Sequence, residues 1–386
     1  MIVAPKIRGF ICTTAHPVGC RENVRRQMEY VKAKPETQCG KKALVIGAST
    51  GYGLASRITA AFSGRAATIG VIFDKPASGI RTASAGWYNT AAFEEFAAKE
   101  GLYAKTINGD AFSQTVKEQV TELIQRDLGQ VDLVIYSLAA PRRTMADGTV
   151  YSSVLKTAGK NYTDKTIDLK DNSVHPVTIS PATPEEIDAT VKVMGGGDWL
   201  DWIRTLSDAG VLASGAVTTA YSYIGPELTH PIYRDGSIGR AKQDLYDTAR
   251  KITREFPGVK GYIGVNKALV TQSSAAIPIV PLYISILYKI MKELGLHEGC
   301  IEQMYRLYHD KLPAENPLLR LDDWEMREEV QTRVAAAWKE IETDTVAQYA
   351  DIDGYWLDFY QMFGFRVPGV DYEADVEVGV SIPSLQ

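Results

Sequence analysis

Short apolar runs recur between residues 40 and 270 and are separated by stretches with helical spacing of apolar residues. Apolar runs of about four to eight residues that end at glycine or polar residues are typical of buried strands. They predict strands at 42–47, 67–73, 102–107, 131–137, 215–223 and 261–265. Between them we expect helices, for example at 114–128, where Val116, Val120 and Leu123 share one face. Strands that alternate with helices predict an α/β fold with a doubly wound, mainly parallel, Rossmann-type sheet.

The alternation is interrupted once and stops before the end of the chain. Within 142–200, short polar β-prone pieces precede a helix at 184–194, which predicts a small β-rich insertion. After about residue 281 the pattern is mostly helical as far as residue 363. We expect a single elaborated domain over 1–386, with an N-terminal wrap (1–40), a Rossmann core (41–280) that carries the insertion, and a helical C-terminal extension (281–386).

The composition is ordinary for a soluble globular protein, with 45% hydrophobic and 23% charged residues among 386. The formal net charge of −5, without a Lys/Arg cluster, argues against a nucleic-acid partner. The longest apolar run, 275–290, contains Pro278, Pro281 and Lys289, and is too short and interrupted to span a bilayer. The N-terminus has no continuous apolar segment typical of a secretion signal. We therefore expect a cytoplasmic enzyme that does not span the membrane.

Metal chemistry is not indicated. Cys12, His16 and Cys20 match no common zinc spacing, and no second ligand pair is present. We therefore expect no metal site. His297 beside Glu298 is interpreted as a capping or surface pair rather than as an acid–base dyad.

The first predicted strand runs into a glycine-rich turn at Gly47, Gly51 and Gly53, and a helical pattern follows. Glycines let a backbone approach a pyrophosphate, and free N–H groups at a helix start hold its charge. The order strand, turn, helix therefore indicates a dinucleotide site, although glycines also make plain tight turns. The spacing GxxxGxG, rather than GxGxxG, resembles the short-chain dehydrogenase/reductase branch of nucleotide-binding folds.

Later strand ends offer further cofactor contacts. Asp74 lies about 20 residues beyond the glycines, where a carboxylate accepts from ribose hydroxyls and repels a 2′-phosphate, so NADH is favoured over NADPH. A solvated strand-end acid is the alternative. Asp110 can accept from an adenine amino group with Ala111 beside it, and Leu138 and Ala139 can lie against the cofactor ribose.

The segment 219–242 combines tyrosines with a lysine. Tyr221 and Tyr223 end a predicted strand, Tyr233 follows a turn, and Lys242 lies nine positions later near the start of a helix. A phenol and an ammonium group that converge on one cleft form a plausible proton-donating pair. A tyrosine near a lysine is also common by chance.

Several motifs together resemble the FabV-type enoyl reductases, the trans-2-enoyl-CoA and enoyl-acyl-carrier-protein reductases. These motifs are GASTGYGLASRI, VIYSLAAPRR, AYSYIG, the Tyr-x8-Lys of Tyr233 and Lys242, NKALVTQSSAAIP and HEGCIEQM, with DDWEMREEVQ nearer the end. The resemblance covers essentially the whole chain. It implies an enlarged short-chain-reductase fold that uses NADH and acts largely as a monomer on enoyl-CoA or enoyl-acyl-carrier-protein.

The resemblance also implies roles for residues. It places the catalytic acid at Tyr233, a substrate-contacting tyrosine at Tyr223, and both a catalytic and a cofactor role at Lys242. Its ribose-binding pair falls on Phe73 and Asp74, where many members have Glu. Its remaining cofactor contacts fall on Gly47, Ala48, Ser49, Thr50, Gly51, Tyr52, Asp110, Ala111, Leu138, Ala139, Leu269, Val270 and Thr271.

These residues suit a hydride addition to the β-carbon of a trans-2-enoyl thioester in fatty-acid synthesis or butyrate-type fermentation. Negative charge then gathers on the thioester oxygen, where Tyr233 can donate and Tyr223 can donate or position. A nearby Lys242 would lower the pKa of Tyr233. The rivals are a ketone or 3-oxoacyl reductase, whose Tyr and Lys usually lie four apart, and a nucleotide-sensing protein without catalysis.

Overall fold

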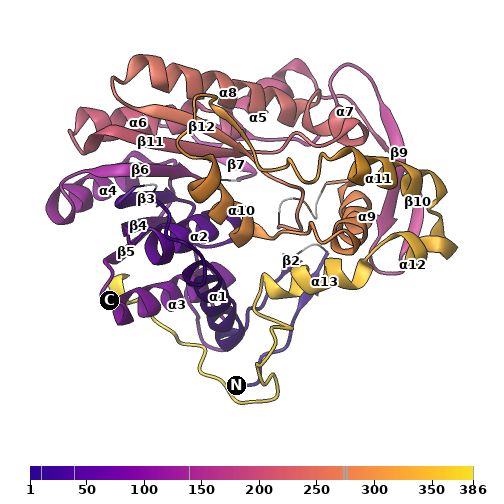
Figure 1. The fold of residues 1–386 in the computed structure, drawn as a ribbon, viewed down its shortest axis with the longest axis horizontal. Coiled ribbons are helices and arrows are strands. Elements are labelled where there is room, and N and C mark those ends of the chain that lie inside the picture. The colour runs from indigo at the N-terminus through magenta and orange to yellow at the C-terminus, as the bar shows by residue number, and fades with distance from the viewer. Residues whose placement is uncertain (10, 39, 139, 273, 275–276, 386) are drawn as a thin grey trace.

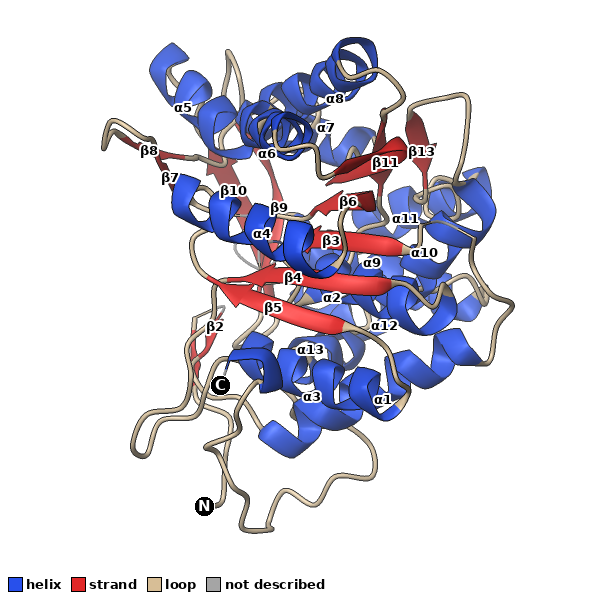
Figure 2. Ribbon diagram, turned by 90° about the vertical axis from the view of Figure 1, so that its left-hand side faces the viewer, coloured by secondary structure: helices blue, strands red, loops and turns tan. Residues whose placement is uncertain are grey.

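The computed structural model describes residues 1–9, 11–38, 40–138, 140–272, 274 and 277–385. Within these ranges seven parallel strands form one sheet in the order β13-β12-β11-β6-β3-β4-β5 (Figure 1; β13 is labelled in Figure 2). The strands are β3 (Lys42–Ile46), β4 (Ala67–Ile72), β5 (Ala104–Asn108), β6 (Val131–Tyr136), β11 (Leu212–Ser222), β12 (Lys260–Val265) and β13 (Leu318–Arg320). The chain adds β4 and β5 on one side of β3 and then crosses to add β6 on the other side. The strand order therefore reverses between β3 and β6.

Helices cover both faces of the sheet because its central strands are apolar on both sides. In β3, Leu44 and Ile46 face one hydrophobic cluster, while Ala43 and Val45 face the other. The first cluster includes residues of α4 (Gln114–Asp127), α6 (Gly197–Asp208) and α8 (Ser237–Glu255). The second includes residues of α1 (Pro17–Lys32), α2 (Gly51–Ile58), α3 (Ala85–Lys99), α9 (Val280–Glu293), α10 (Cys300–Arg306), α11 (Glu328–Glu340) and α13 (Ile352–Gln361) (Figure 2). The predicted doubly wound α/β fold is confirmed.

The segment expected to form a β-rich insertion contains two antiparallel hairpins. They are β7 (Arg142–Thr144) with β8 (Val150–Ser152), and β9 (Tyr162–Asp168) with β10 (Ser173–Ile179). α5 (Pro184–Met194) begins with a capping box between Thr183 and Glu186 and packs against α8. The Thr166 hydroxyl in β9 accepts the backbone N–H of Ile279 at 3.2 Å, which fixes the second hairpin beside the start of α9.

The remaining elements are short. They are β1 (Ile7–Arg8), β2 (Ile11–Cys12), η1 (Thr59–Ser63), η2 (Glu227–Thr229), α7 (His230–Tyr233), η4 (Leu307–Lys311), η5 (Thr343–Thr345), α12 (Val346–Tyr349) and η6 (Pro383–Leu385). The N-terminal amine donates to the carbonyl oxygen of Val376 at 2.7 Å, so the two terminal segments lie side by side. No helix in the described ranges is both long and apolar enough to cross a membrane.

The C-terminal extension is mostly helical, as expected, but it also contributes one strand to the main sheet. β13 forms the edge of that sheet beside Ile263–Val265. Three residues are too few to produce a visible alternation, so this strand left no pattern to read. The helix α9 begins at Val280, directly after Ile279, which has a φ of +75°.

Candidate active site

The glycine-rich turn lies between the end of β3 and the start of α2, at the point where the strand order reverses. Gly47 has a φ of +84°, and a Cβ added there would lie 2.1 Å from the carbonyl oxygen of Ser137. A Cβ at Gly53 would lie 1.9 Å from the carbonyl oxygen of Gly47. At Gly51 an added Cβ would meet no described atom within 4 Å. The turn is therefore closed toward the sheet and open on its outer side, which fits a dinucleotide pyrophosphate.

The expected ribose contact, Asp74, lies two residues beyond β4 and is partly exposed. Its Oδ1 accepts from the Ser84 hydroxyl at 2.7 Å, and its backbone N–H donates to Asn108 Oδ1 at 2.9 Å. A Cβ at Gly86 would lie 2.5 Å from both carboxylate oxygens, so a side chain there would displace the carboxylate. The neighbouring Phe73 is 81% exposed. The carboxylate is thus fixed from one side at the carboxyl edge of the sheet.

The other expected contacts at strand ends differ in their surroundings. Asp110 follows β5, and its Oδ1 accepts the backbone N–H of Phe112 at 3.0 Å, so this carboxylate also shapes its own turn. Ala111 is buried, and its carbonyl oxygen accepts from Trp202. Leu138 follows β6 and lies against the glycine-rich turn. Ala139 lies outside the described residues.

The loop 266–271 follows β12 and reaches the same edge of the sheet. Leu269 and Val270 are each 6% exposed. The backbone N–H of Val270 donates to the Tyr288 hydroxyl of α9 at 3.0 Å. The Ser274 hydroxyl donates to the carbonyl oxygen of Leu269 and accepts the backbone N–H of Thr271, both at 2.8 Å. α9 and Ser274 therefore hold the expected nicotinamide loop in one conformation.

The two expected reaction tyrosines are brought together. Tyr223 follows β11, Tyr233 ends α7, and their ring centroids lie 4.6 Å apart in a T-shaped arrangement. Burial is the largest cause that raises the pKa of each phenol, and the charge of Glu325 adds to it. Both side chains are therefore neutral phenols at pH 7. No described group hydrogen-bonds the Tyr233 hydroxyl, whereas Tyr223 donates to Glu325 at 2.9 Å.

Lys242 lies in the second turn of α8. Its Nζ donates to the backbone carbonyl oxygen of Tyr221 at 3.2 Å, and burial lowers its pKa to about 8. The expectation that Lys242 lowers the pKa of Tyr233 is wrong: burial and the negative charge of Glu325 raise that pKa, and Lys242 is not among its causes. A neutral phenol with a raised pKa remains a hydrogen-bond donor over the whole physiological pH range.

A buried carboxylate joins three segments behind the tyrosines. Glu325 is 0% exposed and lies between β13 and α11. Its Oε1 accepts from Tyr223 at 2.9 Å and from Tyr283, at the start of α9, at 2.6 Å. Its Oε2 accepts the backbone N–H of Ala268 at 2.7 Å. Glu325 thus connects the ends of β11, β12 and β13 with α9.

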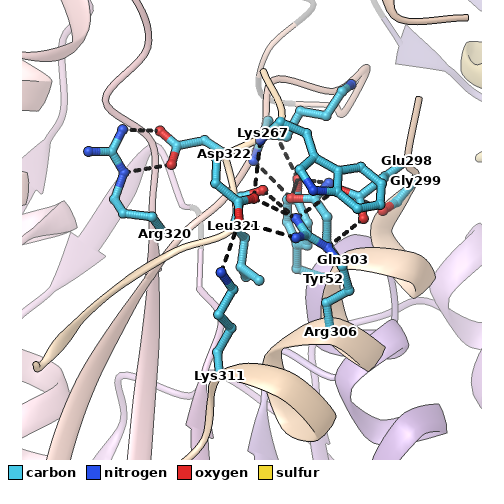
Figure 3. A network of polar contacts seen from close by, with 12 residues as sticks. Tyr52, Lys267, Glu298, Gly299, Gln303, Arg306, Lys311, Arg320, Leu321 and Asp322 are labelled. Atoms are coloured by element: carbon cyan, nitrogen blue, oxygen red, sulfur yellow. Dashed lines mark hydrogen bonds and ion pairs between the residues drawn. The ribbon is translucent and has the colours of Figure 1, made fainter. Parts of the chain in front are cut away.

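Figure 3 shows a second network, which joins the glycine-rich turn to the loop after β12. The Tyr52 hydroxyl donates to the carbonyl oxygen of Lys267 at 2.9 Å. The side-chain oxygen of Gln303 in α10 accepts the backbone N–H of Lys267 at 2.8 Å, and its nitrogen donates to Tyr52 at 3.3 Å. Lys267 is 2% exposed, and burial lowers its pKa to about 8. The two expected cofactor segments are therefore tied together through Gln303.

The interpretation of His297 and Glu298 as a capping or surface pair was wrong. Glu298 is 2% exposed and forms an ion pair with Arg306 at 2.6 Å. Burial raises the pKa of this carboxyl to about 7. The His297 ring packs edge-on against Tyr288 with centroids 4.4 Å apart, and burial lowers its pKa to about 3. The two side chains have different partners, so they form no acid–base dyad.

The sequence reasoning assigned no role to Lys267, Gln303 or Glu325. All three lie inside motifs that carry the family resemblance, namely NKALVTQ, HEGCIEQM and DDWEMREEVQ. A buried acid, amide or lysine produces no periodic pattern, so only its presence within those motifs could have drawn attention to it.

The fold and the geometry at the carboxyl edge of the sheet define a Rossmann-type oxidoreductase. Residues 81–313 match the family model described as the trans-2-enoyl-CoA reductase catalytic region, and residues 2–79 match its NAD(P)H binding domain. The chain is 57% identical over 396 residues to the enoyl-[acyl-carrier-protein] reductase [NADH] of Flavobacterium johnsoniae. It is 54% identical over 394 residues to the trans-2-enoyl-CoA reductase [NADH] of Ruminiclostridium cellulolyticum. Both alignments cover 100% of both chains.

A solved structure agrees. The trans-2-enoyl-CoA reductase of Treponema denticola in complex with NAD is 47% identical, with a TM-score of 0.94 over 97% of this chain and 98% of that chain. The protein belongs to the trans-2-enoyl-CoA reductase family.

Residues 314–376 match a third model, described as an enoyl reductase FAD binding domain. This segment does not fit a flavin dinucleotide by its residues. Its strand, β13, is followed by Asp322 and Asp323 rather than by a glycine-rich turn. Both carboxylates form ion pairs, with Arg320 and Arg306 respectively, so these arginines are already engaged by acids and the turn offers no glycine-rich backbone to a diphosphate.

Proposed function

We propose that this protein reduces the carbon–carbon double bond of trans-2-enoyl thioesters with NADH, giving saturated acyl thioesters. The observation that carries the proposal is the Tyr223–Tyr233 pair, with 4.6 Å between ring centroids, at the sheet edge that also carries the glycine-rich turn. Full-length similarity to relatives named for this activity supports it.

The dinucleotide would be held along the carboxyl edge of the sheet. Gly47–Tyr52 would take the pyrophosphate, and Phe73 with Asp74 the adenosine ribose. Asp110, Ala111, Leu138 and Ala139 would contact the adenosine half and the cofactor ribose. Lys242 would take the nicotinamide ribose hydroxyls, and the loop at Leu269, Val270 and Thr271 the nicotinamide half. The closed inner side of the Gly47 turn and the fixed Asp74 carboxylate support this arrangement.

Bound NADH supplies the hydride that adds to the β-carbon. Side chains of this protein stabilise the negative charge that develops on the thioester oxygen. Tyr233 is the donor for that oxygen, because its hydroxyl is not engaged by any described group. A positioned donor of this kind lowers the barrier by an amount worth about a hundred- to a thousandfold in rate. Tyr223, whose proton is directed to Glu325, contacts the substrate and orders the ring of Tyr233.

A ketone or 3-oxoacyl reductase is the second candidate, since it shares the fold and a tyrosine–lysine pair. The nine-position offset from Tyr233 to Lys242 favours the enoyl reductase. The deciding assay follows NADH oxidation with crotonyl-CoA and with acetoacetyl-CoA at equal concentrations. We expect turnover with crotonyl-CoA. Oxidation with the keto substrate alone would replace our proposal with the second candidate.

The proposal also covers the compartment, the oligomeric state and the pathway of the enzyme. We propose a cytoplasmic monomer, a single elaborated domain with the boundaries given above, acting on enoyl-CoA or enoyl-acyl-carrier-protein in fatty-acid synthesis or butyrate-type fermentation. Relatives named for each of the two carriers have similar identities to this chain, 57% and 54%, so the assay should include both. Sedimentation of the purified protein tests the oligomeric state.

A further inference from the structure

The carboxylate of Glu325 is the least expected feature of the site. It is 0% exposed, and the hydrogen bonds to its side chain come from uncharged donors: two tyrosine hydroxyls and one backbone N–H. A buried carboxylate without a directly bonded cation is costly, because desolvation penalises its charge. The hydrogen bonds that offset this cost also hold their three donors in place.

The donors come from segments that are far apart in the chain. Tyr223 follows β11, Ala268 follows β12, and Tyr283 is in the first turns of α9. Gln331 adds to the arrangement, because its amide nitrogen donates to the backbone oxygen of Glu325 at 2.7 Å and to Tyr283 at 3.3 Å. The carboxylate is thus held from several directions, and its Oε1 fixes where the Tyr223 hydroxyl points.

That direction matters for the neighbouring ring. Tyr223 packs edge-to-face on Tyr233, so a rotation of Tyr223 would change the position of Tyr233. A tyrosine hydroxyl has one proton, and the proton of Tyr223 is directed to Glu325. Tyr223 is therefore not the donor to a substrate oxygen while Glu325 accepts from it.

We propose that Glu325 is a positioning residue for this reaction: its carboxylate takes the Tyr223 proton in a hydrogen bond, fixes that ring against Tyr233, and so leaves Tyr233 as the donor to the substrate. The inference rests on the proposed enoyl-thioester reductase function. Burial raises the pKa of Glu325, while Tyr283, Lys267 and the Ala268 N–H oppose that shift. The acceptor role of the carboxyl rests on geometry, because two hydroxyls and one backbone N–H are directed at its oxygens.

Glu325→Gln separates positioning from folding. A backbone N–H can only donate, whereas tyrosine hydroxyls can also accept. The amide oxygen therefore turns to Ala268, and the NH₂ group turns to the two tyrosines. The Tyr223 hydroxyl then accepts from residue 325 instead of donating to it, so its proton can point elsewhere. We expect kcat on crotonyl-CoA to fall about tenfold, as a small misplacement of a reacting group does. The dissociation constant of NADH should stay within about twofold, because the Ala268 contact is kept.

Glu94→Gln is the matched control. Glu94 is 3% exposed and also accepts three uncharged donors, from Thr106, the Ser384 hydroxyl and the Ser384 N–H. These contacts lie at the β5 edge, away from the tyrosines. Both variants should lower the melting temperature, but only Glu325→Gln should lower kcat. Equal kcat losses in the two variants would reduce Glu325 to a structural role and overturn the proposal.

A double-mutant cycle tests whether Glu325 acts through Tyr223. In the Tyr223→Phe background, Glu325→Gln should lower kcat by less than about twofold further, because the hydroxyl it positions is gone. Losses that multiply in the double variant would overturn the proposal, and so would a Glu325→Gln kcat within about twofold of the unmodified enzyme.

A spectroscopic measurement keeps the inference testable apart from the proposed function. The signal of ¹³Cζ-labelled tyrosine, assigned to Tyr223 by its loss in Tyr223→Phe, reports ionisation of this phenol. Burial is the largest cause that raises the pKa of Tyr223, and the charge and hydrogen bond of Glu325 raise it further, so Glu325→Gln should lower it. An unchanged titration would overturn the positioning role even if crotonyl-CoA is turned over. A lowered pKa in an enzyme inactive on crotonyl-CoA would support the Glu325–Tyr223 coupling and refute the proposed function alone.

Discussion

The two halves of the carboxyl edge of the sheet are built in different ways. At β3 and β4 the candidate site consists of a turn and a strand end. Gly47 and Asp74 each follow a strand closely, so neighbouring residues in the sequence build this half. At β11 to β13 it consists of Tyr223, Tyr233 and Glu325, side chains from segments up to 102 positions apart. The first half is made by backbone conformation and the second by packing. Substitutions should therefore affect cofactor binding through the first half and chemistry through the second.

The largest expected effect is in the second half. Tyr233→Phe removes the proposed donor and should lower kcat on crotonyl-CoA about a hundredfold. The dissociation constant of NADH should stay within about twofold, because the Tyr233 hydroxyl is not part of the glycine-rich turn. Stopped-flow binding and steady-state kinetics measure the two constants. Tyr88→Phe is the control, since Tyr88 is a buried tyrosine of α3 whose hydroxyl donates to Val378. Unchanged turnover in Tyr233→Phe would remove Tyr233 from the donor role.

The next effect belongs to the first half. Gly47→Ala places a Cβ 2.1 Å from the Ser137 carbonyl oxygen at a φ of +84°, so the turn must shift. We expect NADH affinity to fall about tenfold, equivalent to ~1.4 kcal/mol, with a smaller change in kcat. Gly129→Ala is the control for backbone strain, because its φ is +75° and no described atom lies within 4 Å of the new Cβ. If both variants bind NADH equally, backbone strain alone explains any loss of affinity, and the close approach to the Ser137 carbonyl oxygen plays no part in it.

A smaller effect should appear in cofactor choice. Asp74→Ser removes a carboxylate that would repel a 2′-phosphate, and should lower the preference for NADH over NADPH about fivefold, or ~1 kcal/mol. The ratio of kcat/KM for the two cofactors measures this preference. A ratio that does not move would favour the alternative of a solvated strand-end acid.

The smallest effect is a pH dependence. Burial lowers the pKa of Lys242 to about 8, below the ordinary value of 10.5 for a lysine. The charged form, which donates to Tyr221 and would bind the ribose hydroxyls, is therefore lost as pH rises through 8, and the KM for NADH should roughly double there. Stability changes in the opposite sense: the unfolded chain binds more protons between pH 8 and 10.5, so unfolding free energy from this group rises with pH over that window.

Lys242→Arg isolates this group from Lys267, whose pKa is also about 8, because an arginine stays charged throughout. The inflection near pH 8 in the KM for NADH should disappear in the variant. An inflection that persists would assign the titration to Lys267 instead.

The same contrast explains what could be predicted from the sequence. The strands, the insertion and the glycine-rich turn are encoded by neighbouring residues, so their apolar runs and glycines revealed them. Tyr233 and Lys242 were found because their spacing matches a family motif. Three-residue β13 has no periodicity to detect. Glu325 and Gln303 act across the fold, and their partners are set by tertiary packing rather than by any local pattern. The burial of Glu298 depends on Arg306 in the same way.

Isotope transfer tests the central claim most directly. Crotonyl-CoA is reduced with NADH that carries deuterium at the transferable position of C4, and the product is examined by NMR and mass spectrometry. The proposed reaction predicts butyryl-CoA with a single deuterium on the β-carbon, and a solvent-derived proton on the α-carbon. Deuterium on the α-carbon, or no labelled saturated product, would contradict hydride addition to the double bond of the enoyl thioester.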